Sequence, residues 1–489
     1  MYSGSGFSKW EIGDIDVFVH AGKFHLFHLI IPNHDYIAHA ISDDGINWKR
    51  NKNALFVGHP GEWDDDMLWT MNVSKEADYF VMYYTGLKRK DQGKTQRIGK
   101  AKSKDLIHWE KCIDFIPIES KSPHYESIET NNPRKWLSFR DPFLFRDNDE
   151  THLLICARKP YGFVSRRGCV GLATLSKNNT FTLQKNLFSP MVYDDIECPC
   201  SVKINDTYFL IGSIRENLKI KYWYADKFKG EYISHNNNIL LPKGNYAGRV
   251  VKHLEYLLIY SFYFSGDNVH AFRIITPPKQ LIIDTKGQLA LISFYKWKEK
   301  VTRSVYQKKF SKIETLLHNP TSTTIETSSE IVVSTKSGYE VFGCKNPFKS
   351  FIWEGELILY CLGKCGLVFN SDCNGNGYYI SFDFLNGFVK IRQWGHNDKD
   401  VTNNFVFKNL QINQFEHDKH KRIKFSLISF GSYIELSING FVKLTLVDSM
   451  FSGGFIGLYC CSATAGLKNS VLRKLSEPET EYAKDRENH

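Results

Sequence analysis

Residues 37–48 read Ile-Ala-His-Ala-Ile-Ser-Asp-Asp-Gly-Ile-Asn-Trp, and residues 98–109 read Ile-Gly-Lys-Ala-Lys-Ser-Lys-Asp-Leu-Ile-His-Trp. Both stretches begin as a strand of small and apolar residues and continue with Ser-x-Asp, followed by a Trp four residues after that Asp. Looser copies follow at residues 170–174 and 222–226. A unit that recurs roughly every 50 to 70 residues is typical of the blades of a β-propeller.

An aromatic or aliphatic run precedes each copy, and a fifth run of this kind leads into residues 269–272. The five runs are residues 22–28, 79–84, 151–156, 207–212 and 256–261. Such runs predict strands, because β-branched and aromatic side chains suit a pleated, buried surface. Five copies, each with about four short strands, predict a five-bladed β-propeller over residues 1–290.

The pattern changes after the fifth copy. Tyr306, Phe310, Ile313 and Leu317 fall at helical spacing, which predicts a linker with a short helix over residues 291–330. Beyond it, strand patterns interrupted by Asn386-Gly387 and Asn439-Gly440 predict hairpins, because both residues of a tight turn need a positive φ. We therefore expect a β-sandwich over residues 331–475 and a charged tail over residues 476–489. The fold class is all-β.

The composition is that of an ordinary globular chain rich in aromatic residues. Hydrophobic residues make up 42%, charged residues 24% and aromatic residues 14% of the 489 residues. The formal net charge of +10 is spread over interleaved acids and bases, which argues against a nucleic-acid partner. No run of 18 or more apolar residues is present, so no membrane partner is expected.

The eleven cysteines and the first residues bear on the cellular compartment. The cysteine count is odd, several cysteines lie in apolar runs, and residues 1–6 carry no apolar segment of a signal peptide. We expect buried, reduced cysteines in a cytoplasmic protein. Cys198 and Cys200 form a Cys-x-Cys pair without a second pair, so neither a metal nor another cofactor is expected. The oligomeric state stays open.

Acidic residues stand at or near the starts of three predicted blades. Asp14 and Asp16 alternate with apolar residues, so both carboxylates point to one face of the first strand. Asp141 follows Arg140 at the start of the third blade, and Glu197 opens the fourth. Because the innermost strand of each blade lines the propeller axis, we expect Asp14, Asp141 and Glu197 to converge there.

Converging carboxyl groups of this kind suit the cleavage of a glycosidic bond. One carboxylate attacks the anomeric carbon while a carboxylic acid protonates the leaving oxygen. A third acid can bind sugar hydroxyls more tightly as positive charge develops in the transition state. Neighbouring acids raise one another's pKa values, which keeps one of them protonated near neutral pH. The residues thus indicate a glycosidase with a small carbohydrate substrate.

Several motifs resemble those of glycoside hydrolase family 32, the invertase, levanase and inulinase group, and of its relatives in the same five-bladed-propeller clan. Arg140-Asp141-Pro142 and Glu197-Cys198-Pro199 match the family's Arg-Asp-Pro and Glu-Cys motifs. Residues 22–28, 69–73 and 246–249 are similar to three further family segments. The resemblance implies a propeller with a C-terminal sandwich that retains configuration while cleaving β-fructofuranosidic or related furanosidic bonds.

The resemblance also implies roles for single residues. At residues 10–16, Trp-Glu-Ile-Gly-Asp-Ile-Asp replaces the family's Trp-Met-Asn-Asp-Pro-Asn-Gly, so two aspartates are candidates for the nucleophile. Asp14 is expected to be the nucleophile, with Asp16 as its competitor. Asp141 is expected to stabilise the transition state and Glu197 to be the general acid/base. The candidate substrate-binding residues are Arg140, Trp69, Asn72 and Tyr246 from these motifs, together with Asp35 from a turn of the first blade and Asp65 from the acidic run before Trp69, which are chosen for their position and not for a family motif.

Three other functions stay open on the sequence alone. A fructosyltransferase uses the same covalent intermediate and passes the sugar to another hydroxyl. An arabinofuranosidase-type relative shares the propeller and is compatible with the altered N-terminal motif. A carbohydrate-binding protein with a degenerate catalytic site is the third, although a pure binder has no need of an acid/base.

Overall fold

The computed structural model describes residues 2–4, 11–128, 134, 136–264, 273–306, 313–361, 363–396 and 406–478. In these residues the regular structure is β-strand, apart from three short 3-10 helices. The chain forms two compact units, residues 1–289 and residues 290–479. In the part of the chain described, no helix is long and apolar enough to cross a membrane. The expected all-β class is confirmed.

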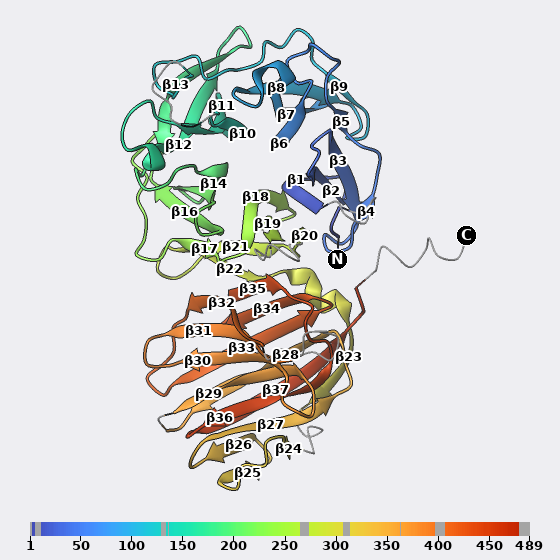
Figure 1. Ribbon diagram of the computed structural model, residues 1–489, viewed down its shortest axis with the longest axis vertical. Helices are drawn as coiled ribbons and strands as arrows, with labels where there is room; N and C mark the ends of the chain where they lie inside the picture. Colours follow the sequence, from blue (N-terminus) through green and yellow to red (C-terminus); the bar gives the residue numbers. More distant parts are fainter. Residues whose placement is uncertain are drawn as a thin grey trace, which may run out of the picture. The chain divides into compact units, whose positions relative to one another are not determined.

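The first unit is a five-bladed β-propeller (Figure 1). Blade I contains β1 (Glu11–His20), β2 (Lys23–Ile31), β3 (Tyr36–Ser42), β4 (Lys49–Arg50) and β5 (Leu55–Phe56). Blade II contains β6 (Met67–Glu76), β7 (Tyr79–Leu87), β8 (Gln96–Ser103) and β9 (Trp109–Lys111). Blade III contains β10 (Phe139–Asp147), β11 (Glu150–Arg158), β12 (Gly168–Leu175) and β13 (Phe181–Phe188).

Two more blades complete the ring. Blade IV contains β14 (Glu197–Ile204), β15 (Thr207–Ile214), β16 (Lys219–Ala225) and β17 (Ile239–Leu241). Blade V contains β18 (Asn245–His253), β19 (Tyr256–Phe264), β20 (Arg273–Ile275) and β21 (Lys279–Ile283), and its sheet ends with β22 (Leu289–Ser293), the strand in which the chain passes from the first unit to the second. The innermost strands β1, β6, β10, β14 and β18 contact one another in turn around the ring, and β18 contacts β1 (Figure 1).

Apolar side chains on both faces of the sheets hold neighbouring blades together. In β7, Met82 and Tyr84 pack into the cluster shared with blade I, whereas Val81 and Tyr83 pack into the cluster shared with blade III. Successive strand residues point to opposite faces, so a continuous apolar run fills two interfaces. This explains why the aromatic-rich runs of the sequence are second strands of blades.

The first residues of the chain join the last blade to the first. The Tyr2 carbonyl accepts a hydrogen bond from the Ile275 N–H in blade V at 3.1 Å, and the Ser3 carbonyl accepts one from the Ile12 N–H in blade I at 3.0 Å. The Tyr2 hydroxyl also lies 2.8 Å from Nε2 of His28. These bonds help close the ring.

The repeated Ser-x-Asp motif builds a hydrogen-bonded corner after the third strand of blades I and II. The Ser42 hydroxyl accepts a bond from the Gly45 N–H at 2.8 Å, and Asp44 Oδ1 accepts bonds from the Ile46 and Asn47 N–H groups at 2.8 Å. Ser103 and Asp105 make the same bonds at 2.8 to 2.9 Å. Short polar side chains bind nearby backbone in this way and so fix turns.

A β-bulge interrupts the innermost strand of each blade near its beginning. The register shifts lie between Ile12 and Ile15, Trp69 and Met71, Arg140 and Phe143, Glu197 and Cys200, and Tyr246 and Arg249. Asp141, Cys198 and Ala247 adopt positive φ values of 60°, 48° and 51° at these points. Because bulges re-aim side chains and recur beside active sites, the five starts of the inner strands mark the functional region.

The second unit contains two antiparallel sheets. One sheet consists of β23 (Val301–Tyr306), β25 (Ser322–Glu326), β26 (Glu330–Thr335), β28 (Phe351–Leu359), β33 (Arg422–Phe430), β34 (Tyr433–Ile438), β35 (Phe441–Val447) and β37 (Thr464–Leu475). The other consists of β24 (Glu314–Thr315), β27 (Tyr339–Asn346), β29 (Lys364–Ser371), β30 (Gly377–Asp383), β31 (Phe388–Gly395), β32 (Val406–Gln414) and β36 (Gly454–Cys461). The expected β-sandwich is confirmed.

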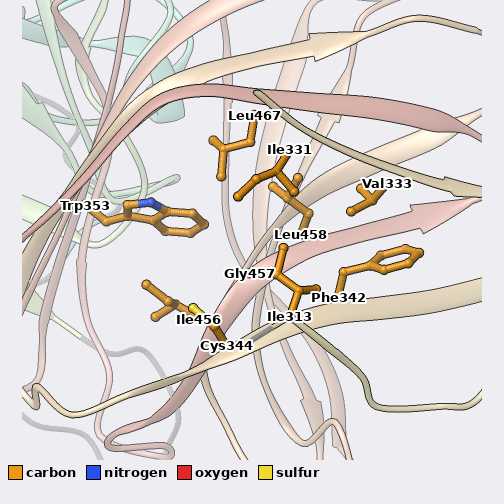
Figure 2. A pocket seen from close by; sticks show the side chains of 10 residues that line it. All are labelled: Ile313, Ile331, Val333, Phe342, Cys344, Trp353, Ile456, Gly457, Leu458 and Leu467. Carbon is orange, nitrogen blue, oxygen red and sulfur yellow. The ribbon is translucent and has the colours of Figure 1, made fainter. Parts of the chain in front are cut away.

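A small gap lies where the two sheets face each other (Figure 2). Ile331, Val333, Trp353 and Leu467 line it from one sheet, and strands β27 and β36 supply the other side. Its volume is about 20 Å³. A gap of this size has room for about one water, but a wall of aliphatic and aromatic side chains offers it few partners. It is a packing gap in the core of the sandwich.

The two Asn-Gly sites behave differently. Asn439 and Gly440 both have positive φ, 52° and 89°, and join β34 to β35 as a two-residue turn. In the other hairpin, β30 ends at Asp383 and β31 begins at Phe388, so a four-residue loop replaces the expected tight turn. Asp383 Oδ1 accepts the Leu385 and Asn386 N–H groups at 3.0 Å and stabilises that loop.

The helix expected within residues 291–330 is wrong where the structure describes it. A 3-10 helix is present at Tyr295–Lys300, but Tyr306 ends strand β23 and pairs with Val471; Phe310 lies outside the described residues. Residues 301–306 contain Val and Thr, and the edge of β37 offers them hydrogen-bond partners, so sheet pairing overrides the helical spacing. The sandwich therefore includes strands upstream of residue 331, and residues 479–489 of the expected tail also lie outside the described residues.

Candidate active site

Asp14 lies within the bulge of β1 and faces blade II. Thr70 of β6 donates its hydroxyl to Asp14 Oδ2 at 2.5 Å. Burial raises the pKa of Asp14, the Thr70 hydrogen bond opposes that effect, and the nearby charge of Glu197 adds to it. Asp14 keeps part of its surface exposed. Thr70 thus fixes one oxygen of Asp14, and the residue as a whole is not fully buried.

Asp141 occupies the bulge of β10, where its backbone and side chain are both anchored. Its N–H donates to Thr85 Oγ1 at 3.1 Å, and its Oδ2 accepts a hydrogen bond from the Cys198 N–H at 2.9 Å. Burial raises the pKa of Asp141, the Arg140 guanidinium opposes the shift, and the charge of Asp14 adds to it. The bond to Cys198 links blade III to blade IV at the level of the candidate site.

Glu197 is the first residue of β14, and each of its carboxyl oxygens accepts a hydrogen bond. Arg140 Nη2 donates to Glu197 Oε1 at 2.5 Å, and the Tyr246 hydroxyl donates to Glu197 Oε2. The Glu197 side chain is 13% exposed. Burial raises its pKa, Arg140 lowers it, and the charges of Asp141 and Asp195 raise it. The net upward direction suits a carboxyl group that must carry a proton near neutral pH.

The structure brings the expected acids together. One oxygen each of Asp14 and Asp141 and the sulfur of Cys198 lie within 4.8 Å of one another. Burial raises the pKa of the Cys198 thiol well above its ordinary value, so the sulfur beside these two carboxyl groups is a neutral thiol. Asp14 also interacts electrostatically with Glu197. Asp14, Asp141 and Glu197 therefore form one cluster.

Asp16 sits in a different environment from Asp14. It is 3% exposed, its Oδ2 accepts the Val73 N–H at 2.6 Å, and both oxygens lie 3.3 Å from Nδ2 of Asn72. Arg249 Nε lies 3.8 Å from its Oδ1. Asp16 thus joins β1 to β6 inside the protein, and its oxygens are occupied.

We expect Asp16→Asn to change how stability depends on pH. Burial raises the pKa of Asp16 from 3.8 to about 6, so the folded state holds this proton more tightly than the unfolded state. The resulting stabilisation is complete below about pH 4 and is lost as the pH rises through about 6, a change of about 3 kcal/mol. In urea unfolding, the variant should gain about this much relative to the wild type between pH 4 and 7. A difference that stays constant with pH would contradict the assignment.

Three of the expected substrate-binding residues lie beside the acids. Arg140 and Tyr246 both bind Glu197 directly, as described above. Trp69 begins the bulge of β6 and is partly exposed; its ring lies 6.0 Å from the Arg140 guanidinium and 5.8 Å from the His34 ring. Arg140 and Tyr246 thus lie beside Glu197, and Trp69 lies beside Arg140.

The other three expected residues have different surroundings. Asn72 is 5% exposed and is used inside the protein, because its Nδ2 approaches Asp16 while its Oδ1 accepts the Leu144 N–H at 2.8 Å. Asp65 accepts the Gly61 and Arg89 N–H groups at 2.7 and 2.9 Å, so it shapes its own loop. Asp35 is exposed, and its carbonyl accepts the Val57 N–H at 2.9 Å.

The site contains residues that the sequence analysis did not single out. Thr70 and Thr85 hold Asp14 and Asp141, and Arg249 bonds the Pro199 carbonyl at 2.9 Å while facing Asp16. Asp195 lies 3.1 Å from Arg140 Nη2. The sequence offers a local signal for three of these residues. Thr70 and Arg249 lie within the family-like segments 69–73 and 246–249, and Asp195 precedes Glu197 by two residues.

Comparisons with known proteins agree with this geometry. Residues 13–255 match the model of the Glycosyl hydrolases family 32 N-terminal domain, whereas no curated protein sequence matches the chain. A sucrose-6-phosphate hydrolase from Lactobacillus gasseri is 16% identical with a TM-score of 0.70, covering 95% of this chain and 91% of that one. A fructan 1-exohydrolase IIa from Cichorium intybus is 14% identical with a TM-score of 0.68, covering 96% of each. An exo-inulinase from Aspergillus awamori is 13% identical with a TM-score of 0.66, covering 95% and 96%.

The match of residues 13–255 identifies the propeller as a glycoside hydrolase domain. The structural matches at these identities show the two-unit fold, and the match of residues 13–255 supplies the family. Residues 13–255 form a glycosyl hydrolases family 32 N-terminal domain.

Proposed function

We propose that the protein is a retaining β-fructofuranosidase-type hydrolase that acts on small oligosaccharides. The observation that carries the proposal is the meeting of Asp14, Asp141 and Glu197 at the bulged starts of three inner strands. Solved structures with this fold include a sucrose-6-phosphate hydrolase and a fructan 1-exohydrolase, which supports fructosides as the substrate class.

Asp14 is the nucleophile of the proposed reaction. Its carboxylate attacks the anomeric carbon while Glu197 gives its proton to the leaving oxygen, so the glycosidic bond breaks and a glycosyl ester forms. Glu197 then takes a proton from water, and the water oxygen displaces Asp14. Asp14 rather than Asp16 is assigned this role because Asp14 is partly exposed, whereas both oxygens of Asp16 face protein donors.

Asp141 stabilises the transition state in this scheme. The Cys198 N–H holds one of its oxygens, which leaves the other suited to accept a hydrogen bond from a sugar hydroxyl. Its negative charge, close to Asp14, also favours an oxocarbenium-like ring. Trp69 offers an aromatic face against which the substrate can pack, because sugar C–H groups pack on aromatic rings. Arg140 and Tyr246 hold Glu197 in place.

A substrate screen tests the proposal. Purified protein is incubated with sucrose, inulin-type oligomers, levan-type oligomers and aryl arabinofuranosides, and released monosaccharides and transfer products are quantified against Glu197→Gln. We expect free fructose from at least one fructoside. Arabinose release alone would instead support an arabinofuranosidase, and longer oligomers formed at low substrate concentration would support a transferase. If no furanoside is turned over faster by the wild type than by the variant, the proposal fails.

A further inference from the structure

The guanidinium of Arg140 serves two carboxylates with the same nitrogen. Nη2 lies 2.5 Å from Glu197 Oε1 and 3.1 Å from Asp195 Oδ2. Arg140 is 4% exposed, so water contributes little to screening its charge. Asp195 and Glu197 therefore compete for the same guanidinium group. The more strongly Arg140 binds Asp195, the less it stabilises the ionised form of Glu197.

Asp195 is itself firmly held. It is 1% exposed, its Oδ2 accepts the Ser138 hydroxyl at 3.0 Å, and Arg134 Nη1 lies 3.4 Å from its Oδ1. Although burial opposes the charge, the guanidinium groups of Arg140 and Arg134 hold the pKa of Asp195 below its usual value. Asp195 thus stays ionised at the pH values where Glu197 titrates.

Several other charged or titratable groups surround this pair. Those that face Glu197 come from four blades, and they are Asp14, Arg140, Asp141, Cys156, Cys198 and Tyr246. Those that face Asp195, besides Arg140 and Arg134, are Arg158, Cys156 and Cys169. Burial raises the pKa values of the three thiols, so they stay neutral, and the balance is set by the carboxylates and guanidinium groups.

We infer that Asp195 is a positioning residue that shares Arg140 with Glu197 and thereby keeps Glu197 able to carry a proton. Without Asp195, Arg140 has Glu197 as its main hydrogen-bonded anion, and an ion pair of that kind favours the ionised carboxylate. An ionised Glu197 has no proton to give to a leaving oxygen. The inference rests on the proposed role of Glu197 as acid/base and adds the residue that sets its working pH range.

Direct titration tests this without any substrate. The protein is labelled with carbon-13 at its glutamate carboxyl groups, and the Glu197 NMR signal is assigned as the one missing from Glu197→Gln. In Asp195→Asn the signal should titrate at lower pH than in the wild type. Arg134→Gln removes a cation from the other side of Asp195, leaves Asp195 free to draw Arg140 away, and should move the titration to higher pH. Unchanged titration in both variants, or shifts in the same direction, would overturn the inference.

The pH dependence of the reaction gives a second readout. For Asp195→Asn on sucrose, we expect kcat/KM near pH 5 within about threefold of the wild type and a loss of about tenfold or more near pH 8. On an aryl fructofuranoside whose leaving group needs no proton, the loss near pH 8 should be smaller. A role in stability alone would lower both substrates equally at every pH and would contradict the inference.

Glu150→Gln provides the control. Glu150 lies in blade III, its side chain is 57% exposed and it pairs with Lys229 at 2.8 Å, so the variant removes one negative charge without removing a partner of Arg140 or Asp195. Its pH profile should keep the wild-type shape. An inactive wild type whose Glu197 signal still shifts in Asp195→Asn would refute the proposed function and keep the inference. An active wild type whose Glu197 signal does not shift in Asp195→Asn would keep the proposed function and refute the inference.

Discussion

Replacing Glu197 with Gln should lower kcat/KM on sucrose by about 10³-fold, within the range of about 10² to 10⁴ that a general acid contributes. Gln has nearly the shape of Glu; its carbonyl oxygen can accept the Arg140 N–H while its NH2 group donates to the Tyr246 hydroxyl oxygen, so the fold should survive. What is lost is the proton for the leaving oxygen. An aryl fructofuranoside with a good leaving group needs no such proton, and for it the burst of released phenol should persist while steady turnover slows.

Glu150→Gln is a suitable control for this experiment. Glu150 is also a glutamate at the start of a propeller strand, but its side chain is 57% exposed and pairs with Lys229 at 2.8 Å. This variant should keep kcat/KM within about twofold of the wild type, because exposed pairs contribute little. Equal losses on sucrose and on the aryl fructofuranoside in Glu197→Gln would contradict the acid/base role.

The second large effect is expected at Asp14. Asp14→Asn removes the attacking carboxylate while keeping the Thr70 hydrogen-bond geometry available, and kcat should fall about 10⁴-fold or more with KM little changed. The measurement is initial-rate kinetics on sucrose with protein whose thermal unfolding matches the wild type.

Asp16→Asn is the matched comparison, since both acids lie on β1 and both contact β6. Asp16 binds the Val73 N–H and faces Arg249 rather than the other acids, so we expect kcat within about tenfold of the wild type together with the altered pH dependence of stability. A complete loss of kcat in Asp16→Asn with an active Asp14→Asn would reverse the assignment.

The propeller could be predicted from sequence because its information is local and repeated. Each blade repeats an apolar run that is buried on both faces, and the Ser-x-Asp corner is made of hydrogen bonds between residues two and three positions apart. The sandwich strands around Asn439-Gly440 carry an equally local signal. The prediction of a helix around Tyr306 is wrong because this segment pairs with an edge of β37, which distant residues contribute.

The candidate site also combines residues that local motifs identify with residues that depend on distant parts of the chain. Asp141 and Glu197 are found by short motifs, since each bulge is encoded where it forms. Their partners depend on how neighbouring blades meet: Thr70 reaches Asp14 across 56 residues, and Arg140 reaches Asp195 across 55. No pattern along the chain fixes such pairings. Asn72 of β6 is the opposite case. Its place in a motif predicts a sugar contact, whereas its amide bonds Asp16 of β1 and the Leu144 N–H of β10.

The proposed covalent bond between Asp14 and the sugar can be trapped. The Glu197→Gln protein is mixed with an activated aryl fructofuranoside, quenched in acid, digested and mapped by mass spectrometry. Without its base, the variant should accumulate the glycosyl ester, and the adduct should lie on Asp14. An adduct on Asp16 would refute Asp14 as the nucleophile, and release of sugar with inverted configuration and no adduct on any residue would refute the double displacement.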